Sequence, residues 1–210
     1  MSRNAIVTSM LQVKGTKGYS AATEGFMTAT HKIAFQELHQ SILKFIPTDS
    51  SDVLDVGSGI GRDAAALADM GHTVVAVEPT SEFLSVAQRL YGTSIEWIND
   101  SFPFLPSLGD RNEGFDFVLA SAVWHHLDQH ERRIALSRIA DLLRPTGIFA
   151  LSLRHGPAGV GTHIFPTDGQ ETVRDAERVN LEPLQVLENQ PSLVKGKRNV
   201  TWTRIVLQKA

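Results

Sequence analysis

Hydrophobic positions along the chain form short apolar runs, separated by longer segments in which apolar residues recur with a helical period. Short apolar runs between turn residues are typical of buried strands. Seven strands are predicted, at Val53–Val56, Thr73–Val77, Ser94–Ile98, Phe115–Ala120, Ile148–Leu153, Leu184–Glu188 and Val200–Gln208. Strands that alternate with helices pair in parallel through right-handed crossovers, so most of this sheet should be parallel.

The helical segments are predicted at 31–46, at 61–70, from residue 80 or 81, from 128, and at 168–179. The first carries its apolar residues on one face and is followed by Pro47. Asp128 precedes Glu131 by three residues, which is an Asp variant of the capping box that begins helices. That helix is expected to include Leu143 and to be closed by Pro145.

The last two predicted strands have no helix between them, so they should pair antiparallel. The sequence therefore predicts an α/β fold with an open sheet of seven strands, mostly parallel with an antiparallel last strand, and helices on both faces. Residues 1–30 are rich in Gly, Ser and Thr and are expected to form an N-terminal arm or lid, while residues 31–210 form a single domain.

Composition narrows the possible functions. The net charge of −3 gives no basic excess for binding a phosphate backbone, so no nucleic-acid partner is expected. The absence of cysteine excludes disulfides and a cysteine nucleophile. No apolar run approaches the roughly 20 residues of a membrane span, so no membrane partner is expected and the cytoplasm is the expected compartment. No set of His and carboxylate residues has a metal-binding spacing, so no metal is predicted.

A glycine-rich turn follows the first strand in the stretch VLDVGSGIGRD. Gly57, Gly59 and Gly61 leave the backbone bare, which allows a sharp turn and close approach by a ligand. The dinucleotide fingerprint would need a glycine at Arg62, and the phosphate-binding P-loop would need a Gly-Lys-Ser/Thr sequence. Neither pattern is present, so the bare backbone points to another ligand; Arg62 itself is expected to face solvent or pair with an acid.

Three carboxylates accompany this turn. Glu78 ends the second strand, where a carboxylate can accept two hydrogen bonds from a ribose diol. Asp100 follows the third strand and could accept from an adenine amino group. Asp55 precedes the glycines and could help to hold an ammonium group through water.

In this order and spacing, the residues resemble the class I S-adenosylmethionine-dependent methyltransferases, and the region from Leu54 to Leu153 follows the family pattern. The resemblance implies a Rossmann-like fold, S-adenosyl-L-methionine as cofactor and S-adenosyl-L-homocysteine as product. It also implies that the backbone around Ser121 faces the methionine part. The residues expected to bind the cofactor are Tyr19, Asp55, Gly57, Ser58, Gly59, Gly61, Glu78, Pro79, Asp100, Ser101 and Ser121.

The methyl acceptor is expected to be a small molecule, methylated at oxygen or nitrogen by direct in-line displacement. The fourth strand is followed by ASAVWHHL, without the Asn/Asp-Pro-Pro-Tyr/Phe motif typical of enzymes that methylate base amino groups or glutamine amides. His126, Arg154 and His155 follow strand ends beside the expected methyl group and are the candidate catalytic residues. Arg154 could clamp a carboxylate, and a histidine could accept a proton.

Three alternatives remain open at this point. The first is a methyltransferase for protein or RNA, and the second is a nicotinamide-dependent enzyme, which Arg62 in the third-glycine position disfavours. The third is a non-catalytic module that binds the cofactor and regulates a partner. The chain is expected to be a monomer or a homodimer.

Overall fold

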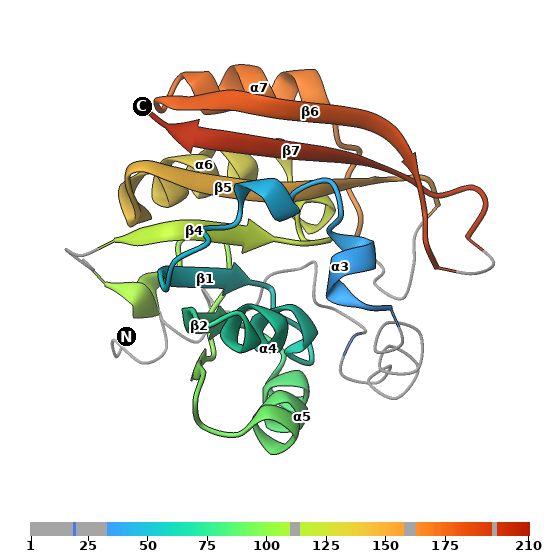
Figure 1. Cartoon of the computed structure of the whole chain (residues 1–210). Helices are drawn as coiled ribbons and strands as arrows, with labels where there is room; N and C mark the ends of the chain where they lie inside the picture. The colour runs from blue at the N-terminus through green and yellow to red at the C-terminus, as the bar shows by residue number, and fades with distance from the viewer. Residues whose placement is uncertain (1–18, 20–32, 110–113, 158–162, 195–196) are drawn as a thin grey trace, which may run out of the picture.

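The computed structural model describes residues 19, 33–109, 114–157, 163–194 and 197–210. Seven strands form one sheet in the order β3-β2-β1-β4-β5-β7-β6 (Figure 1). The strands are β1 (Asp52–Val56), β2 (Thr73–Val77), β3 (Glu96–Ile98), β4 (Phe115–Ala120), β5 (Leu143–His155), β6 (Leu181–Pro191) and β7 (Thr201–Lys209). Strands β1 to β5 pair in parallel, and β7 is antiparallel to both of its neighbours. The predicted seven-stranded sheet with an antiparallel last strand is thereby confirmed.

The helices lie on both faces of the sheet, as predicted (Figure 1). Their bounds are α3 (Phe35–Leu38), α4 (Arg62–Asp69), α5 (Ser81–Tyr91), α6 (Gln129–Leu142) and α7 (Gly169–Glu177), with 3-10 turns η3 (Leu43–Phe45), η4 (Pro106–Leu108) and η5 (Trp124–His126). The predicted capping box is present at α6. The Asp128 carboxylate accepts from the Glu131 backbone N–H at 2.8 Å, and the Glu131 carboxylate accepts from the Asp128 N–H at 2.8 Å.

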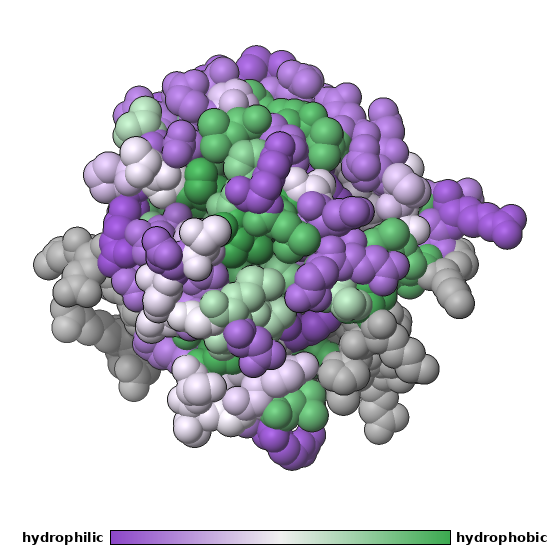
Figure 2. All heavy atoms as spheres, viewed as in Figure 1, coloured by the Kyte–Doolittle hydropathy of each residue, from purple (hydrophilic) through white to green (hydrophobic). Residues whose placement is uncertain are grey.

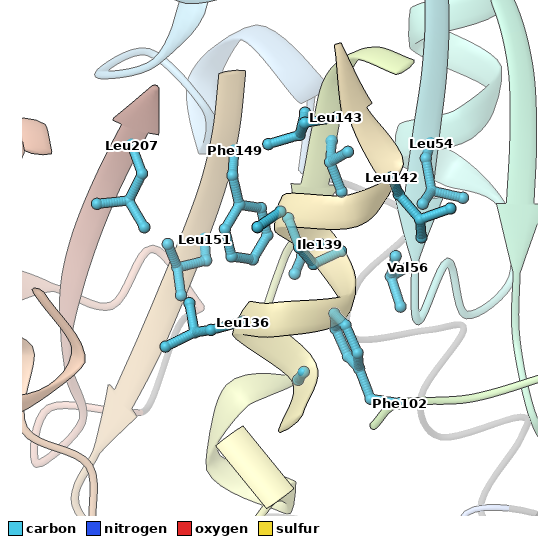
Figure 3. Close-up of a cluster of buried hydrophobic side chains, with 14 of the residues drawn as sticks. Leu54, Val56, Phe102, Leu136, Ile139, Leu142, Leu143, Phe149, Leu151 and Leu207 are labelled. Atoms are coloured by element: carbon cyan, nitrogen blue, oxygen red, sulfur yellow. The ribbon is translucent and has the colours of Figure 1, made fainter. Parts of the chain in front are cut away.

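Side chains that alternate along each strand divide the core into two layers. Val53 packs in the layer beneath α3 and α4, whereas Leu54 and Val56 belong to the layer on the opposite face. Figure 3 shows the second layer, where Leu136 and Ile139 of α6 meet the strand side chains. Because the central strands are covered on both faces, their sequences are continuous apolar runs.

The surface also retains hydrophobic side chains. Figure 2 shows a hydrophobic patch, surrounded by hydrophilic residues, on the face viewed in Figure 1. Within the described part of the chain, no helix is both long enough and apolar enough to cross a membrane. The predicted arm at residues 1–30 lies outside the described residues, apart from Tyr19.

The predicted helix over residues 31–46 is wrong over most of its length. Helix α3 ends at Leu38, and the chain continues in turns whose backbone bonds join residues three apart, such as Ile42 N–H to the His39 carbonyl. No side chain caps α3 at Ala34, and an uncapped short helix is marginal without tertiary support. The residue after α3, His39, is buried, and its ring contacts Asp63. This tertiary contact accompanies the end of the helix at Leu38.

The end of α6 also differs from the prediction. Leu143 is the first residue of β5 rather than the last turn of the helix. Pro145 disfavours the helical conformation at Arg144, so the helix must end before that residue. Leu143 is nevertheless buried in the core. An apolar residue is therefore expected at this position whether it belongs to the helix or to the strand.

Candidate active site

A cavity of about 260 Å³ opens at the carboxyl ends of the central strands. Strand order reverses between β1 and β4, which is where open α/β sheets bind their ligands. The sequence-predicted residues on its wall are Tyr19, Gly57, Ser58, Gly59, Glu78, Pro79, Ser101, Ser121, His126 and Arg154. Asp55, Gly61, Asp100 and His155 do not line it.

The glycine turn adopts a conformation that disfavours other residues. Gly57, Gly59 and Gly61 have φ angles of +73°, +58° and +87°. A Cβ atom at Gly57 would lie 2.4 Å from a methyl carbon of Val123, and one at Gly61 would lie 2.5 Å from the Trp97 ring. Gly57 therefore serves both the turn and the cavity wall, whereas Gly61 allows Trp97 to pack against the start of α4.

Glu78 is buried at the end of β2 and is held by two backbone donors. Its Oε2 accepts from the Gly59 N–H at 3.0 Å, and its Oε1 accepts from the Thr80 N–H at 2.8 Å. Burial raises the pKa of Glu78, while the hydrogen bonds from Thr80 and Gly59 oppose the increase. Each carboxylate oxygen has a second lone pair, so a neighbouring diol can still donate to it.

The other two predicted carboxylates lie behind the wall. Both oxygens of Asp100 accept backbone N–H bonds, from Ser101 at 2.7 Å and Ser107 at 2.6 Å, and thus fix the loop after β3. Asp55 is buried, and its Oδ2 has no hydrogen-bond partner among the described residues. Burial and the nearby Asp63 carboxylate raise the pKa of Asp55 well above its usual value.

Asp63, which the sequence reasoning missed, joins the first helical turn of α4 to α3. Its Oδ2 lies 2.9 Å from His39 Nε2, and its Oδ1 accepts from Arg62 Nε at 2.7 Å. Burial raises the pKa of Asp63, but His39 and Arg62 outweigh burial and hold the pKa well below its usual value. The expected pairing of Arg62 with an acid is confirmed.

His126 lies between two oxygen atoms at the far side of the cavity. Its Nδ1 is 3.0 Å from the His163 carbonyl oxygen, and its Nε2 is 3.0 Å from the Tyr19 hydroxyl. The carbonyl can only accept, so Nδ1 carries the proton and Nε2 accepts from Tyr19 in the neutral ring. Burial lowers the pKa of His126, and nearby Arg154 lowers it further. The ring is therefore neutral, and its one lone pair is engaged by the Tyr19 hydroxyl.

The two histidines beside this base have different surroundings. His125 also lines the cavity, with its ring 4.1 Å from that of His126, and burial lowers its pKa to about 2. His155 lies outside the cavity lining, where its Nε2 is 2.8 Å from the Thr203 hydroxyl. The structure brings His126 and Arg154 together at the cavity and directs His155 to the opposite face of the sheet.

Arg154 is buried and donates to the Gly156 carbonyl at 3.3 Å. Three more cations line the same cavity: Arg62, which pairs with Asp63, and Lys197 and Arg204, neither of which was a candidate from the sequence. A sequence signal did exist for Arg204, because it lies inside the predicted last strand, directly before the apolar run at 205–207. No group of three or more metal-binding side chains occurs among the described residues.

Comparisons with known proteins agree with this architecture. Residues 53–147 match the family model described as a methyltransferase domain. An uncharacterized methyltransferase of Mycobacterium tuberculosis strain H37Rv is 37% identical over 118 residues, covering 53% of this chain and 57% of that protein. The chain thus spans little more than half the length of this relative.

Two solved structures resemble the chain in fold. The 1,6-didemethyltoxoflavin-N1-methyltransferase of Burkholderia thailandensis, solved with 1,6-didemethyltoxoflavin and S-adenosylhomocysteine, aligns with a TM-score of 0.70 and 20% identity, covering 100% of this chain and 92% of that one. A TehB-like methyltransferase of Corynebacterium glutamicum gives a TM-score of 0.65 and 21% identity, covering 93% and 98%. Residues 53–147 thus match a methyltransferase-domain model, and the chain has the fold of these solved methyltransferases, as its glycine turn and strand order predicted.

Proposed function

We propose that the protein is an S-adenosylmethionine-dependent methyltransferase that transfers a methyl group to an oxygen or nitrogen atom of a small molecule. The observation that carries the proposal is the buried Glu78 carboxylate beside the bare glycine backbone at the switch point of the sheet. This arrangement suits a ribose diol, and the glycine turn has neither phosphate-binding pattern.

Two buried polar atoms near the glycine turn support the choice of cofactor. Asp55 offers a buried carboxyl oxygen without a partner among the described residues, close to the turn that would receive an ammonium group. The Ser58 hydroxyl is also buried without a partner in that part of the chain and lies on the cavity wall. When bound, the cofactor supplies an activated methyl group on a sulfonium, so the protein has to orient the acceptor and exclude water.

The residues on the acceptor side of the cavity suit a small-molecule acceptor and, where that acceptor carries a proton, the removal of the proton. Tyr19 and His126 both line the cavity, and the Tyr19 hydroxyl donates to His126 Nε2. Proton removal from a hydroxyl or an amine would then run to the Tyr19 oxygen while Tyr19 passes its own proton to His126. The structure of the 1,6-didemethyltoxoflavin-N1-methyltransferase holds the small molecule 1,6-didemethyltoxoflavin, which favours a small-molecule acceptor for this chain as well. The N-terminal lid, the cytoplasmic location and the monomeric or homodimeric state stay predictions.

Calorimetric titration tests the proposal. Wild-type protein should bind S-adenosylmethionine and S-adenosylhomocysteine but not NADH. Glu78→Gln should weaken binding by about tenfold or more, since a lost hydrogen bond to a charged group costs about 1.5–3 kcal/mol. Glu82→Gln is the matched control, because Glu82 is exposed in the first turn of the next helix.

The remaining outcomes distinguish the alternatives. Absence of binding for both sulfur compounds would refute the proposal, and binding of NADH instead would favour a nicotinamide enzyme. Cofactor binding without formation of S-adenosylhomocysteine across a broad acceptor panel would indicate a non-catalytic module. Turnover on a protein or RNA alone would contradict the small-molecule assignment.

A further inference from the structure

Two buried arginines lie on neighbouring strands at the acceptor side of the cavity. Ser152 of β5 pairs with Arg204 of β7, and Arg154 pairs with Trp202 in the same ladder. Side chains two residues apart share a face of a sheet, so these four residues form one patch. The patch continues the row of Ala150 and Val206, which pack in the core beneath α3 and α4. The face thus changes from apolar to cationic where it reaches the cavity.

Neither guanidinium has a counter-charge within the described part of the chain. Arg154 and Arg204 are only 7% and 9% exposed, yet neither makes an ion pair there. Burial lowers the pKa of both arginines; among the described residues only the nearby Tyr19 opposes this decrease at Arg154, and none opposes it at Arg204. By contrast Arg144, which is more exposed, pairs with two carboxylates.

A third cation and several apolar groups complete this side of the cavity. Lys197 lines it from an exposed position, and its pKa is lowered by burial and by nearby Arg154. Ile164, Val194 and Trp202 contribute apolar wall on the same side. Like charges that are withdrawn from water repel each other and are costly unless an anion joins them.

We infer that this side of the cavity is an oxyanion subsite, in which Arg154 and Arg204 hold a carboxylate or phosphate, so that the methyl acceptor is an anionic small molecule with an apolar body. The planar guanidinium fork matches both oxyanions. The role of the bound anion as methyl acceptor rests on the proposed function, whereas the oxyanion subsite itself rests on the two arginines.

The cofactor's own carboxylate is the other possible source of an oxyanion. By the family resemblance, the methionine end is expected between the glycine turn after β1 and the backbone around Ser121 after β4. Strand β7 lies three strands from β1 and two from β4, in the order β1-β4-β5-β7. Adjacent strands are about 4.8 Å apart, so Arg204 belongs to a strand roughly 14 Å from β1 and roughly 10 Å from β4. For Arg204 this separation favours the acceptor as the source of the anion, and Arg204 is therefore the arginine that the test replaces.

The test is a titration of the full chain with benzoate and with phenyl phosphate, in the presence of saturating S-adenosylhomocysteine. Benzamide is the matched neutral probe. We expect at least one anion to bind and benzamide to bind at least about tenfold more weakly, the scale of one charge-assisted contact. Arg204→Gln should weaken anion binding by a similar factor. Arg89→Gln, at an exposed position on α5, should have no effect.

Several results would overturn the inference. Equal binding of benzoate, phenyl phosphate and benzamide to wild-type protein would do so without any variant, which keeps the test decisive if Arg204→Gln does not fold. Unchanged anion binding in a folded Arg204→Gln protein would also overturn it. Displacement of S-adenosylhomocysteine by the anion would assign the arginines to the cofactor carboxylate instead.

The two proposals fail in different ways. If S-adenosylhomocysteine does not bind, the same titrations of the free protein still report on the oxyanion subsite, and only the methyl-acceptor role falls with the proposed function. If S-adenosylhomocysteine binds and the anions do not, the proposed function stands and the oxyanion subsite is refuted.

Discussion

Replacing Gly57 by alanine adds one methyl group at a crowded turn, and the structure allows its cost to be estimated in two parts. The φ angle of +73° is strained for an L-residue, by about 1–2 kcal/mol. The new Cβ would also lie 2.4 Å from Val123 Cγ2. Overpacking of this kind costs about 1–3 kcal/mol. We therefore expect Gly57→Ala to lower the free energy of unfolding by about 2–5 kcal/mol, a large part of the roughly 5–15 kcal/mol typical of a domain.

Urea unfolding with a matched glycine separates the two parts. Gly71 has a φ of +96°, but a Cβ atom there would meet nothing within 4 Å in the described part of the chain. Gly71→Ala should therefore show the backbone cost alone, about 1–2 kcal/mol. A double-mutant cycle of Gly57→Ala with Val123→Ala should show that removing the valine methyls recovers about 1–3 kcal/mol. Equal destabilisation by Gly57→Ala and Gly71→Ala, with no coupling to Val123, would refute the steric reasoning.

Two further predictions concern buried charge. Asp63→Asn removes the buried partner of His39 and should cost about 3–5 kcal/mol in urea unfolding. Asp52→Asn, whose carboxylate pairs with Arg144 at the surface, should cost less than about 1 kcal/mol, and equal losses would contradict this reasoning. His125 has a pKa of about 2 in the folded protein, against about 6.5 when unfolded, so the unfolded state binds the extra proton between these values. Well below pH 6.5, His125 alone should therefore lower the free energy of unfolding by up to about 1.4 kcal/mol per pH unit, and His125→Asn should make the pH dependence shallower by about that amount; an unchanged slope would argue against a buried neutral ring.

Local patterns were sufficient to predict most of the sheet. The predicted bounds at 73–77 and 115–120 coincide with β2 and β4, because these apolar runs are covered on both faces and are bounded by turns. The Asp128 capping box was also recognisable, since both of its hydrogen bonds involve residues three apart. The positive φ values of the glycine turn agree with the predicted sharp turn, because glycine adopts such angles without steric cost.

Long-range contacts explain what the sequence did not predict. The His39–Asp63 contact joins side chains 24 positions apart, and it replaces the helical continuation that the apolar spacing of residues 31–46 suggested. Asp100 occurs at the expected place after β3, but its oxygens are directed to Ser101 and Ser107, which spacing alone could not reveal.

The two sides of the cavity differ in charge, and this division follows from strand order. Toward β1 and β2 the cavity is lined by Glu78 and by Asp63, whose partner Arg62 lies in the same wall, whereas the cations on β5 and β7 lie beyond β4. A sulfonium donor on the acidic side and an anionic acceptor on the cationic side would each meet groups of opposite sign. When the methyl group passes from the sulfonium to a hydroxyl or an amine, the sulfonium loses its charge, a proton leaves the acceptor, and the oxyanion held by Arg154 and Arg204 keeps its own charge. Arg154 and Arg204 would then serve to bind and orient the acceptor, with His126 needed only where the acceptor atom still carries a proton.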